Sequence, residues 1–255
     1  MADYGELKER VAIITGGGQG LGRAFALAFA AQGAIPVIAD MNADRAESVA
    51  EEVRQMGGQA LAVHTDVSDV KSVQDMADAV MRTFGRIDIL INNAAIFSTL
   101  KMRPFYEIPI AEWNQVLDVN INGALHSARA VCRPMMEAGW GRIINVSSAS
   151  VKEGRANYMH YTTSKSALIG MTRSMARELG SRGITVNALL PGATLTEVER
   201  ETVSPAQMEQ MVGRRCIPRE ETAGDLVGTV LFLASDAAAF LTGQCVTVDG
   251  GMTHS

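Results

Sequence analysis

The chain has 255 residues, 47% hydrophobic and 20% charged, a composition that excludes a disordered or fibrous protein. Its 23 Lys and Arg residues against 28 Asp and Glu residues give a net charge of −5, which argues against a nucleic-acid or anionic-membrane surface. No run approaches the roughly 18 apolar residues of a membrane span, and the polar N-terminal segment lacks the apolar core of a signal peptide, so we expect a cytosolic location. Cys132, Cys216 and Cys245 fit neither a disulfide framework nor a zinc site, and no metal is predicted.

Short apolar runs rich in Val and Ile alternate with helical patterns along the whole chain. The runs cover residues 11–15, 34–39, 60–64, 87–91, 142–146, 185–190 and 244–248, and the helical patterns cover 22–32, 43–56, 70–84, 110–136, 161–181 and 222–234. Continuously apolar runs indicate strands buried on both faces of a parallel sheet. The alternation predicts one doubly wound Rossmann-type α/β domain over residues 1–255, with a mostly parallel seven-stranded sheet and its ligand crevice at the carboxyl ends of the strands.

A glycine-rich segment, TGGGQGLG at residues 15–22, joins the first predicted strand to the first predicted helix. Glycines at such a junction let the backbone approach a pyrophosphate, and the helix N-terminus offers free N–H groups and a positive dipole end. Neither GxGxxG nor an NTPase GK[ST] motif is present, and a tight turn without a ligand is the alternative. The candidate cofactor-binding residues here are Gly16, Gly18, Gln19, Gly20 and Leu21.

Two acidic residues follow the second and third predicted strands. Asp40 stands twenty residues after Gly20, where a carboxylate can accept hydrogen bonds from ribose hydroxyls and repel a 2′-phosphate. Because no Arg or Lys stands beside Asp40 in the sequence and Gln19 occupies the loop, we expect NAD rather than NADP. A solvated acid at a strand end is the alternative for Asp40, and a helix N-cap is the alternative for Asp66.

Tyr161 and Lys165 lie four residues apart in a predicted helix and therefore share one face. A nearby ammonium favours the phenolate anion and lowers the pKa of a phenol, which suits the phenol for proton transfer. The strand that precedes this helix ends in Ser147 and Ser148, where a hydroxyl can bind a substrate oxygen. Asn93 follows another strand in the same layer, and Asn120 lies in the long helical pattern after it.

The ordered set of motifs resembles the short-chain dehydrogenase/reductase family over nearly the whole chain. One departure is that the family usually has Asn-Asn-Ala-Gly, whereas this chain has Ala94-Ala95 after its two asparagines. The stretches 156–161 and 242–252 look like the secondary-alcohol and arylalkanol dehydrogenases of the family. The resemblance rests on the TGGGQGLG loop, Asp66-Val67, Asn92-Asn93-Ala94, Asn120, Ser148, Tyr161 and Lys165, Pro191-Gly192 with Thr196, and the LTGQ and VDGG segments that end the chain.

The resemblance implies an active site of Asn120, Ser148, Tyr161 and Lys165. Tyr161 would be the general acid/base, Lys165 would lower its pKa and bind the nicotinamide ribose, Ser148 would polarise the substrate oxygen, and Asn120 would hold a water of a proton relay. Further cofactor contacts implied by the resemblance are Asp66 and Val67 to the adenine, Asn93 to the ribose side, and Thr194 and Thr196 to the carboxamide and phosphates. A homotetramer is implied as well.

Three stretches, 95–103, 149–159 and 195–217, are expected to form the substrate pocket, with residues of about 193–217 acting as a mobile lid. Their bases are interpreted as solvated rim charges, with binding of an anionic substrate as the alternative. The sequence therefore predicts an NAD-dependent oxidoreductase that interconverts a small-molecule secondary alcohol and its ketone. An oxoacyl-thioester reductase, a dehydrogenase of an anionic or sugar-like substrate and a cofactor-binding sensor without turnover are the alternatives. The bases of the pocket stretches are Lys101, Arg103, Lys152, Arg155, Arg214 and Arg215.

Overall fold

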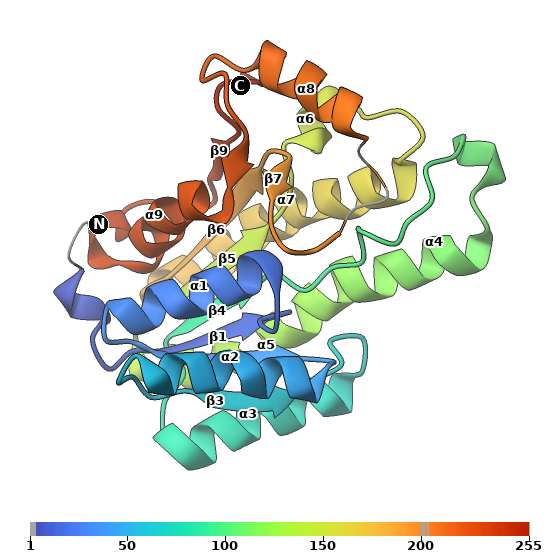
Figure 1. Ribbon diagram of the computed structural model, residues 1–255. Helices are drawn as coiled ribbons and strands as arrows, with labels where there is room; N and C mark the ends of the chain where they lie inside the picture. The colour runs from blue at the N-terminus through green and yellow to red at the C-terminus, as the bar shows by residue number, and fades with distance from the viewer. Residues whose placement is uncertain (1–3, 200–201, 203, 255) are drawn as a thin grey trace.

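Seven parallel strands form the central sheet of the computed structural model, which describes residues 4–199, 202 and 204–254 (Figure 1). Their spatial order is β3–β2–β1–β4–β5–β6–β9, and every adjacent pair is parallel. All seven predicted strands are present in this sheet, so the predicted doubly wound α/β fold is confirmed. The bounds are β1 Val11–Thr15, β2 Ile35–Asp40, β3 Leu61–His64, β4 Ile89–Asn92, β5 Gly141–Val146, β6 Ile184–Pro191 and β9 Cys245–Val248.

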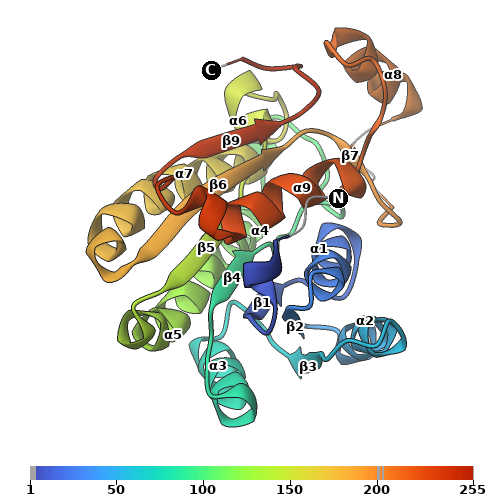
Figure 2. The ribbon, with the colours of Figure 1, turned by 90° about the vertical axis from the view of Figure 1, so that its left-hand side faces the viewer.

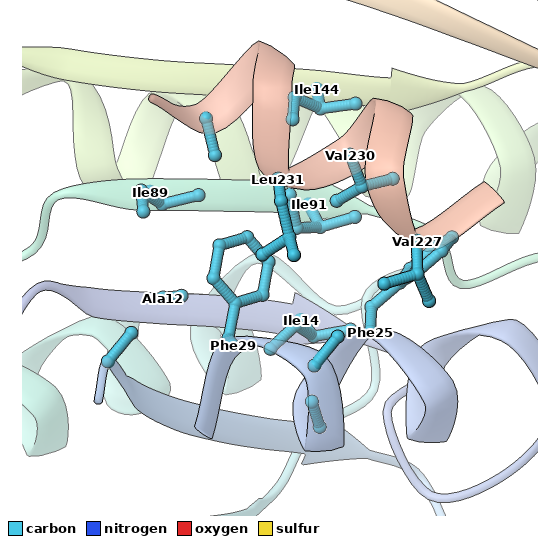
Figure 3. Packing of buried hydrophobic residues seen from close by; sticks show 14 of the residues in the cluster. Ala12, Ile14, Phe25, Phe29, Ile89, Ile91, Ile144, Val227, Val230 and Leu231 are labelled. Carbon is cyan, nitrogen blue, oxygen red and sulfur yellow. The ribbon is translucent and has the colours of Figure 1, made fainter. Parts of the chain in front are cut away.

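Helices cover both faces of the sheet, as expected for strands that are apolar on both sides (Figure 2). One layer contains α1 (Gly20–Ala31), α2 (Ala43–Gln55) and α9 (Ala223–Ala234), and the other contains α3 (Val70–Phe84), α5 (Gly123–Ala138) and α7 (Met159–Leu179). Phe29 of α1 packs between Leu231 of α9 and Ile91 of β4, and all three side chains are fully buried (Figure 3). This packing fixes α1 against the sheet and thereby places the glycine-rich segment at the carboxyl end of β1.

The helical pattern at residues 110–136 does not form one continuous α-helix. It divides into α4 (Ile110–Leu117), a π-helical turn (Asp118–Asn122) and α5. A π turn inserts an extra residue into the helix and rotates the residues within it relative to a regular helix. Apolar periodicity alone does not register such a single extra residue, so the interruption was not predicted.

Shorter elements complete the chain around the carboxyl edge of the sheet. A two-stranded parallel pair joins β7 (Thr194–Leu195) to β8 (Glu221–Thr222), and α8 (Pro205–Arg214) lies between them in sequence. A capping box at Ser204 and Gln207 starts α8, and Met208, Met211 and Val212 lie within this helix. The remaining helical turns are α6 (Ser150–Glu153) and the 3-10 turns Gly5–Leu7, Phe105–Glu107, Gly180–Arg182 and Asp236–Ala238.

The strand order reverses between β1 and β4, which are neighbours in the sheet although β2 and β3 separate them in sequence. Connections leave these two strands in opposite directions, so a crevice forms beyond their carboxyl ends. No helix among the described residues combines the length and the apolar character that crossing a membrane requires.

Candidate active site

A cavity of about 870 Å³ lies at the carboxyl ends of the central strands. It runs from Asp40 at the end of β2 to Ser148 after β5 and Tyr161 in α7. The sheet topology thus brings together residues that are more than a hundred positions apart in sequence. All of the predicted site residues line this cavity except Gly18 and Asn120, which lie directly behind its wall.

The glycine-rich segment approaches other backbone so closely that side chains would not fit. A Cβ atom on Gly22 would lie 2.1 Å from the Gly16 carbonyl oxygen, well inside van der Waals contact. Gly20 starts α1 with a φ of +57°, a conformation that glycine adopts without strain. Asn93 reinforces the loop, because its side-chain Nδ2 donates to the carbonyls of Thr15 and Gly16 at 3.0 and 3.1 Å. Gly16 and Gly20 line the cavity, so the backbone of this segment carries no side chain at these two positions of the cavity wall.

Asp40 is held against this segment by backbone donors. Its Oδ2 accepts a hydrogen bond from the Gly18 amide at 2.9 Å, and its Oδ1 accepts one from the Asn42 amide at 2.9 Å. A basic residue that the sequence analysis overlooked lies in the same region: Arg45, in the first turn of α2, donates to Gln19 Oε1 at 2.6 Å and lines the cavity. The signal was available, since Asn42 is an N-cap and Arg45 follows it by one helical turn.

Asp66 and Val67 form the adjoining wall of the cavity. The Asp66 carboxylate caps the turn before α3, where Oδ1 accepts hydrogen bonds from the Ser68 amide and hydroxyl. Val67 is buried against Gly123, where an added Cβ would lie 2.6 Å from the Val67 Cγ2 atom. The contact with Gly123 presses the Val67 side chain against the start of α5 and fixes this part of the wall.

Tyr161 and Lys165 lie one turn apart in α7, and both line the cavity. The Lys165 side chain is buried, its Nζ donates to the Val146 carbonyl at 2.7 Å, and Nζ lies 5.8 Å from the centre of the Tyr161 ring. Burial lowers the pKa of Lys165 to about 7, because desolvation disfavours the ammonium form. An anionic neighbour would favour the ammonium form of a buried lysine.

The structure separates Ser147 from Ser148, which the sequence distinguished only by spacing. Ser147 is buried, and its hydroxyl donates to the Lys165 carbonyl at 2.7 Å, so it ties β5 to α7. Ser148 turns to the cavity, where its Oγ accepts hydrogen bonds from the Ser150 amide at 3.2 Å and the Ser150 hydroxyl at 2.9 Å. The Ser148 hydroxyl hydrogen stays available for another acceptor, since both of these contacts use its oxygen as acceptor.

Asn120 lies in the π-helical turn and connects two walls of the cavity. Its Oδ1 accepts from the Ile96 amide at 2.8 Å, while its Nδ2 donates to the Ile96 carbonyl at 3.2 Å and to Ser164 Oγ at 3.0 Å. The Ser164 hydroxyl in turn donates to the Tyr161 carbonyl at 2.7 Å. The π turn thus aims a buried amide at the first turns of α7, and Ser164 is a positioning residue that the sequence analysis did not identify.

The residues after β6 close the cavity through buried polar contacts. Thr194 is buried and donates to Glu221 Oε1 at 2.6 Å, while Arg215 approaches the other oxygen of this carboxylate at 3.6 Å. Burial raises the pKa of Glu221, and the Thr194 hydrogen bond and the Arg215 charge oppose that rise. Interpreting Arg215 as a solvated rim charge was therefore wrong, because its side chain is only 1% exposed.

Glu197, on the same segment, reaches across to the glycine-rich segment. Its Oε1 accepts a hydrogen bond from the Gly20 amide at 2.9 Å, at the N-terminus of α1. A Cβ atom on Gly20 would meet Val198 Cγ2 at 3.2 Å, so residues 196–198 lie directly over this helix end. A sequence pattern does not reveal such a contact, since 177 positions separate the two residues.

Comparison with known proteins shows which family this chain is similar to. The profile of a family described as Enoyl-(Acyl carrier protein) reductase matches residues 16–253. The 7alpha-hydroxysteroid dehydrogenase of Escherichia coli strain K12 is 34% identical over 250 residues, covering 98% of this chain and 96% of that protein. The 3-oxoacyl-[acyl-carrier-protein] reductase FabG of Pseudomonas aeruginosa is 37% identical over 249 residues, covering 98% and 99%.

A solved structure is also similar to this chain over nearly its whole length. A 7alpha-hydroxysteroid dehydrogenase in complex with NADH and 7-oxo glycochenodeoxycholic acid superimposes with a TM-score of 0.91 at 34% identity, covering 98% of each chain. This chain belongs to the short-chain dehydrogenase/reductase family. It is therefore an oxidoreductase enzyme of that family, as the resemblance of its motifs predicted.

One residue beside the motif of this short-chain dehydrogenase/reductase faces away from the cavity. His160 is buried and packs against Glu112 of α4, with 3.3 Å between His160 Nε2 and Glu112 Oε1. Burial lowers the pKa of His160, and the Glu112 carboxylate opposes that effect. His160 thus supports the packing of α4 on α7 and does not line the cavity.

Proposed function

We propose that this member of the family is an NAD(H)-dependent oxidoreductase that interconverts a secondary alcohol and its ketone. In the oxidative direction Tyr161 takes the hydroxyl proton, and Ser148 donates a hydrogen bond to the oxygen that becomes the carbonyl. Lys165 stabilises the tyrosinate, and Asn120 keeps the backbone around Tyr161 in place through Ser164. When bound, the nicotinamide supplies the hydride acceptor or donor.

The observation that carries this proposal is the burial of the Lys165 amine beside Tyr161. A lysine that is fully desolvated and donates to a single carbonyl is costly unless a neighbouring negative charge compensates for it. A tyrosinate at Tyr161 supplies that charge during the reaction. The two side chains are therefore arranged for proton transfer rather than for structural stability.

The residues at the other end of the cavity fit a dinucleotide. Gly20 at the N-terminus of α1 lines the cavity, where the positive end of the helix dipole suits a phosphate. Asp40 offers a carboxylate that is already oriented by backbone donors and would repel a 2′-phosphate. The other predicted cofactor-binding residues that line the cavity are Gly16, Gln19, Leu21, Asp66, Val67, Asn93, Thr194 and Thr196.

Replacing Asp40 should change the choice of cofactor. We expect the wild-type enzyme to have a higher kcat/KM with NAD⁺ than with NADP⁺, and Asp40→Asn to reduce that preference by roughly 10- to 150-fold, the usual value of a charged hydrogen bond. Arg45 then becomes the nearest base for a 2′-phosphate, so Arg45→Ala in the Asp40→Asn background should lower the gain with NADP⁺. A wild-type preference for NADP⁺ in steady-state kinetics would contradict the proposal.

Removing the Glu197 charge should tighten cofactor binding. The carboxylate lies on the helix end that we assign to the pyrophosphate, so it repels the phosphates. Because this side chain is largely exposed, we expect Glu197→Gln to lower the Kd of NADH only about 2- to 5-fold at low salt. Fluorescence titration of NADH measures this change, with Glu199→Gln as the control for net charge. Weaker NADH binding by Glu197→Gln would mean that the Gly20 contact supports the bound state instead.

We extend the proposal to a lid, an assembly and a location. Residues 193–217 would act as the lid, because Thr196, Val198 and Met211 line the cavity from that segment, of which residues 200, 201 and 203 lie outside the described part of the chain. A homotetramer and a cytoplasmic location are expected of this enzyme, and size-exclusion chromatography with light scattering tests the assembly.

The relatives favour hydroxyl-bearing small molecules as substrates. One acts on hydroxysteroids, and the second candidate, reduction of an oxoacyl thioester, follows from the similarity to a 3-oxoacyl-[acyl-carrier-protein] reductase. We rank it second because Asp40 disfavours NADPH.

A substrate panel tests the proposed activity. Secondary alcohols, hydroxy acids, sugars and an oxoacyl thioester would be assayed with NAD(H) and NADP(H) by nicotinamide absorbance. Turnover of alcohols with NAD⁺ is the expected result. Tight NADH binding without turnover of any panel member would favour a cofactor-binding sensor.

A further inference from the structure

The six bases of the predicted pocket stretches have different environments in the structure. Lys101 and Lys152 are exposed to solvent. Arg103 pairs with Glu112 at 3.4 Å, Arg214 pairs with Glu153 at 3.1 Å, and Arg215 is buried beside Glu221. Arg155 differs from the other five, because it is the one of these six that lines the cavity.

The Arg155 guanidinium contacts only neutral groups among the described residues. Its NH2 group donates to the Thr202 carbonyl at 2.6 Å and lies 3.5 Å from the Met102 sulfur. The guanidinium carbon lies 5.1 Å from the centre of the Tyr158 ring. Within the described part of the chain no carboxylate comes within 4.0 Å of Arg155, and Glu153, the acid nearest to it in sequence, pairs with Arg214 instead. Its positive charge is therefore not neutralised by an ion pair there.

Arg155 lies close to the reacting end of the cavity. The Tyr158 ring stacks on the Tyr161 ring, with 4.7 Å between the ring centres and 28° between the ring planes. Arg155, Tyr158 and Tyr161 thus follow one another along the same wall, with one aromatic ring between the cation and the catalytic phenol. A substrate whose hydroxyl meets Tyr161 would extend past Tyr158 before reaching the guanidinium.

The side chains around this path match a substrate with an apolar middle and a charged end. Ile96, Phe97 and Met211 line the cavity together with Tyr158. The Tyr158 hydroxyl donates to the Phe97 carbonyl at 2.8 Å, which keeps the ring edge fixed in the wall. A planar guanidinium with free N–H groups suits a carboxylate, which it binds through paired hydrogen bonds.

We propose that Arg155 binds the carboxylate of a hydroxy-acid substrate whose secondary hydroxyl lies several bonds away at Tyr161. This inference rests on the proposed function and narrows its substrate class from secondary alcohols to anionic ones. Arg155 determines the specificity and takes no part in proton or hydride transfer. It should therefore act mainly on KM, whereas Tyr161 acts on kcat.

Matched pairs of substrates test this assignment. 3-Hydroxybutanoate, 4-hydroxypentanoate and 5-hydroxyhexanoate would each be compared with the corresponding neutral amide, using NAD⁺ and wild-type enzyme, Arg155→Gln, Arg155→Lys and Lys152→Gln. Wild type should prefer at least one acid over its amide by about tenfold or more in kcat/KM. Arg155→Gln should raise KM for that acid by about 10- to 150-fold and affect the amide much less. Arg155→Lys should retain part of the preference, because it keeps the charge without the planar fork.

The control and the opposing outcomes are distinct. Lys152→Gln removes an exposed charge three residues away and should keep the preference for the acid. Equal turnover of acids and amides by wild type, or an equal loss on both in Arg155→Gln, would overturn the inference and leave Arg155 as a support for Thr202. If no alcohol, charged or neutral, is oxidised by wild type, the proposed function itself fails. Thermal unfolding of each variant identifies any loss of activity that comes from misfolding.

Discussion

Tyr161→Phe should leave folding and NADH binding nearly intact and lower kcat by about 10²- to 10⁴-fold, the usual contribution of a general acid or base. The substitution keeps the ring and its stacking on Tyr158, and it deletes only the group that exchanges the proton. The oxidation rate of the wild-type enzyme should also rise with pH through one ionisation, because only a tyrosinate accepts the hydroxyl proton. Steady-state kinetics of both proteins from pH 6 to pH 10 measures these effects.

Tyr158→Phe is the matched control for this experiment. Its hydroxyl donates to the Phe97 carbonyl, so the variant should lose about 0.5–1.5 kcal/mol of unfolding free energy while kcat falls much less than in Tyr161→Phe. Normal turnover by Tyr161→Phe together with inactive Tyr158→Phe would show that the wrong tyrosine has been assigned as the base.

Lys165→Met should lower kcat/KM by at least about 10²-fold and should also weaken NADH binding, because the amine serves both the phenol and the cofactor ribose in our proposal. Methionine retains much of the buried aliphatic length and removes the amine that donates to the Val146 carbonyl. A loss confined to kcat, with unchanged affinity for NADH in a fluorescence titration, would leave Lys165 with the proton-transfer role alone.

The buried amine also predicts how stability depends on pH. Its pKa is lowered from 10.5 to about 7, so between these pH values the unfolded chain binds more protons at this position than the folded chain. The free energy of unfolding should therefore rise with pH in this window, by up to about 1.4 kcal/mol per pH unit, and the full desolvation penalty should be present below pH 7.

Denaturant unfolding of the cofactor-free proteins checks this sign. The difference in unfolding free energy between wild type and Lys165→Met should change across the window, whereas Lys152→Met, at an exposed position, should follow wild type. Parallel pH profiles for wild type and Lys165→Met would mean that the buried amine keeps its ordinary protonation.

The order of the strands brings the proposed cofactor-binding residues and the proposed catalytic residues into one cavity. Asp40 ends β2 and Ser148 follows β5, yet both line one cavity since β1 and β4 lie side by side between them. The parallel direction of all these strands places every carboxyl end at the same edge. In proteins of one fold, differences in the loops at such an edge can change substrate specificity while the sheet keeps its arrangement. The names of the relatives, a hydroxysteroid dehydrogenase and an oxoacyl reductase, are consistent with this.

Local patterns in the sequence were sufficient to predict the seven strands of the sheet and most of the residues that line the cavity. Apolar runs such as Val11–Thr15 are buried in full, because a parallel strand must be apolar on both faces. The four-residue spacing of Tyr161 and Lys165 places them on one helix face by geometry alone. The bare backbone of the glycine-rich segment and the acid at Asp40 were likewise recognisable, since each depends on neighbours in sequence.

Other features depended on contacts between distant segments and became visible only in the tertiary structure. Ser147 and Ser148 are chemically alike, and only packing of β5 against α7 buries one of them at the Lys165 carbonyl. Arg155 and Arg215 carry the same charge, and the sequence does not distinguish them. In the structure Glu221 pairs with Arg215, whereas no described carboxylate lies within 4.0 Å of Arg155. Periodicity indicates which face of an element is buried, whereas long-range folding decides which acid pairs with a given base. Only the tertiary structure therefore distinguished Arg155 from Arg215.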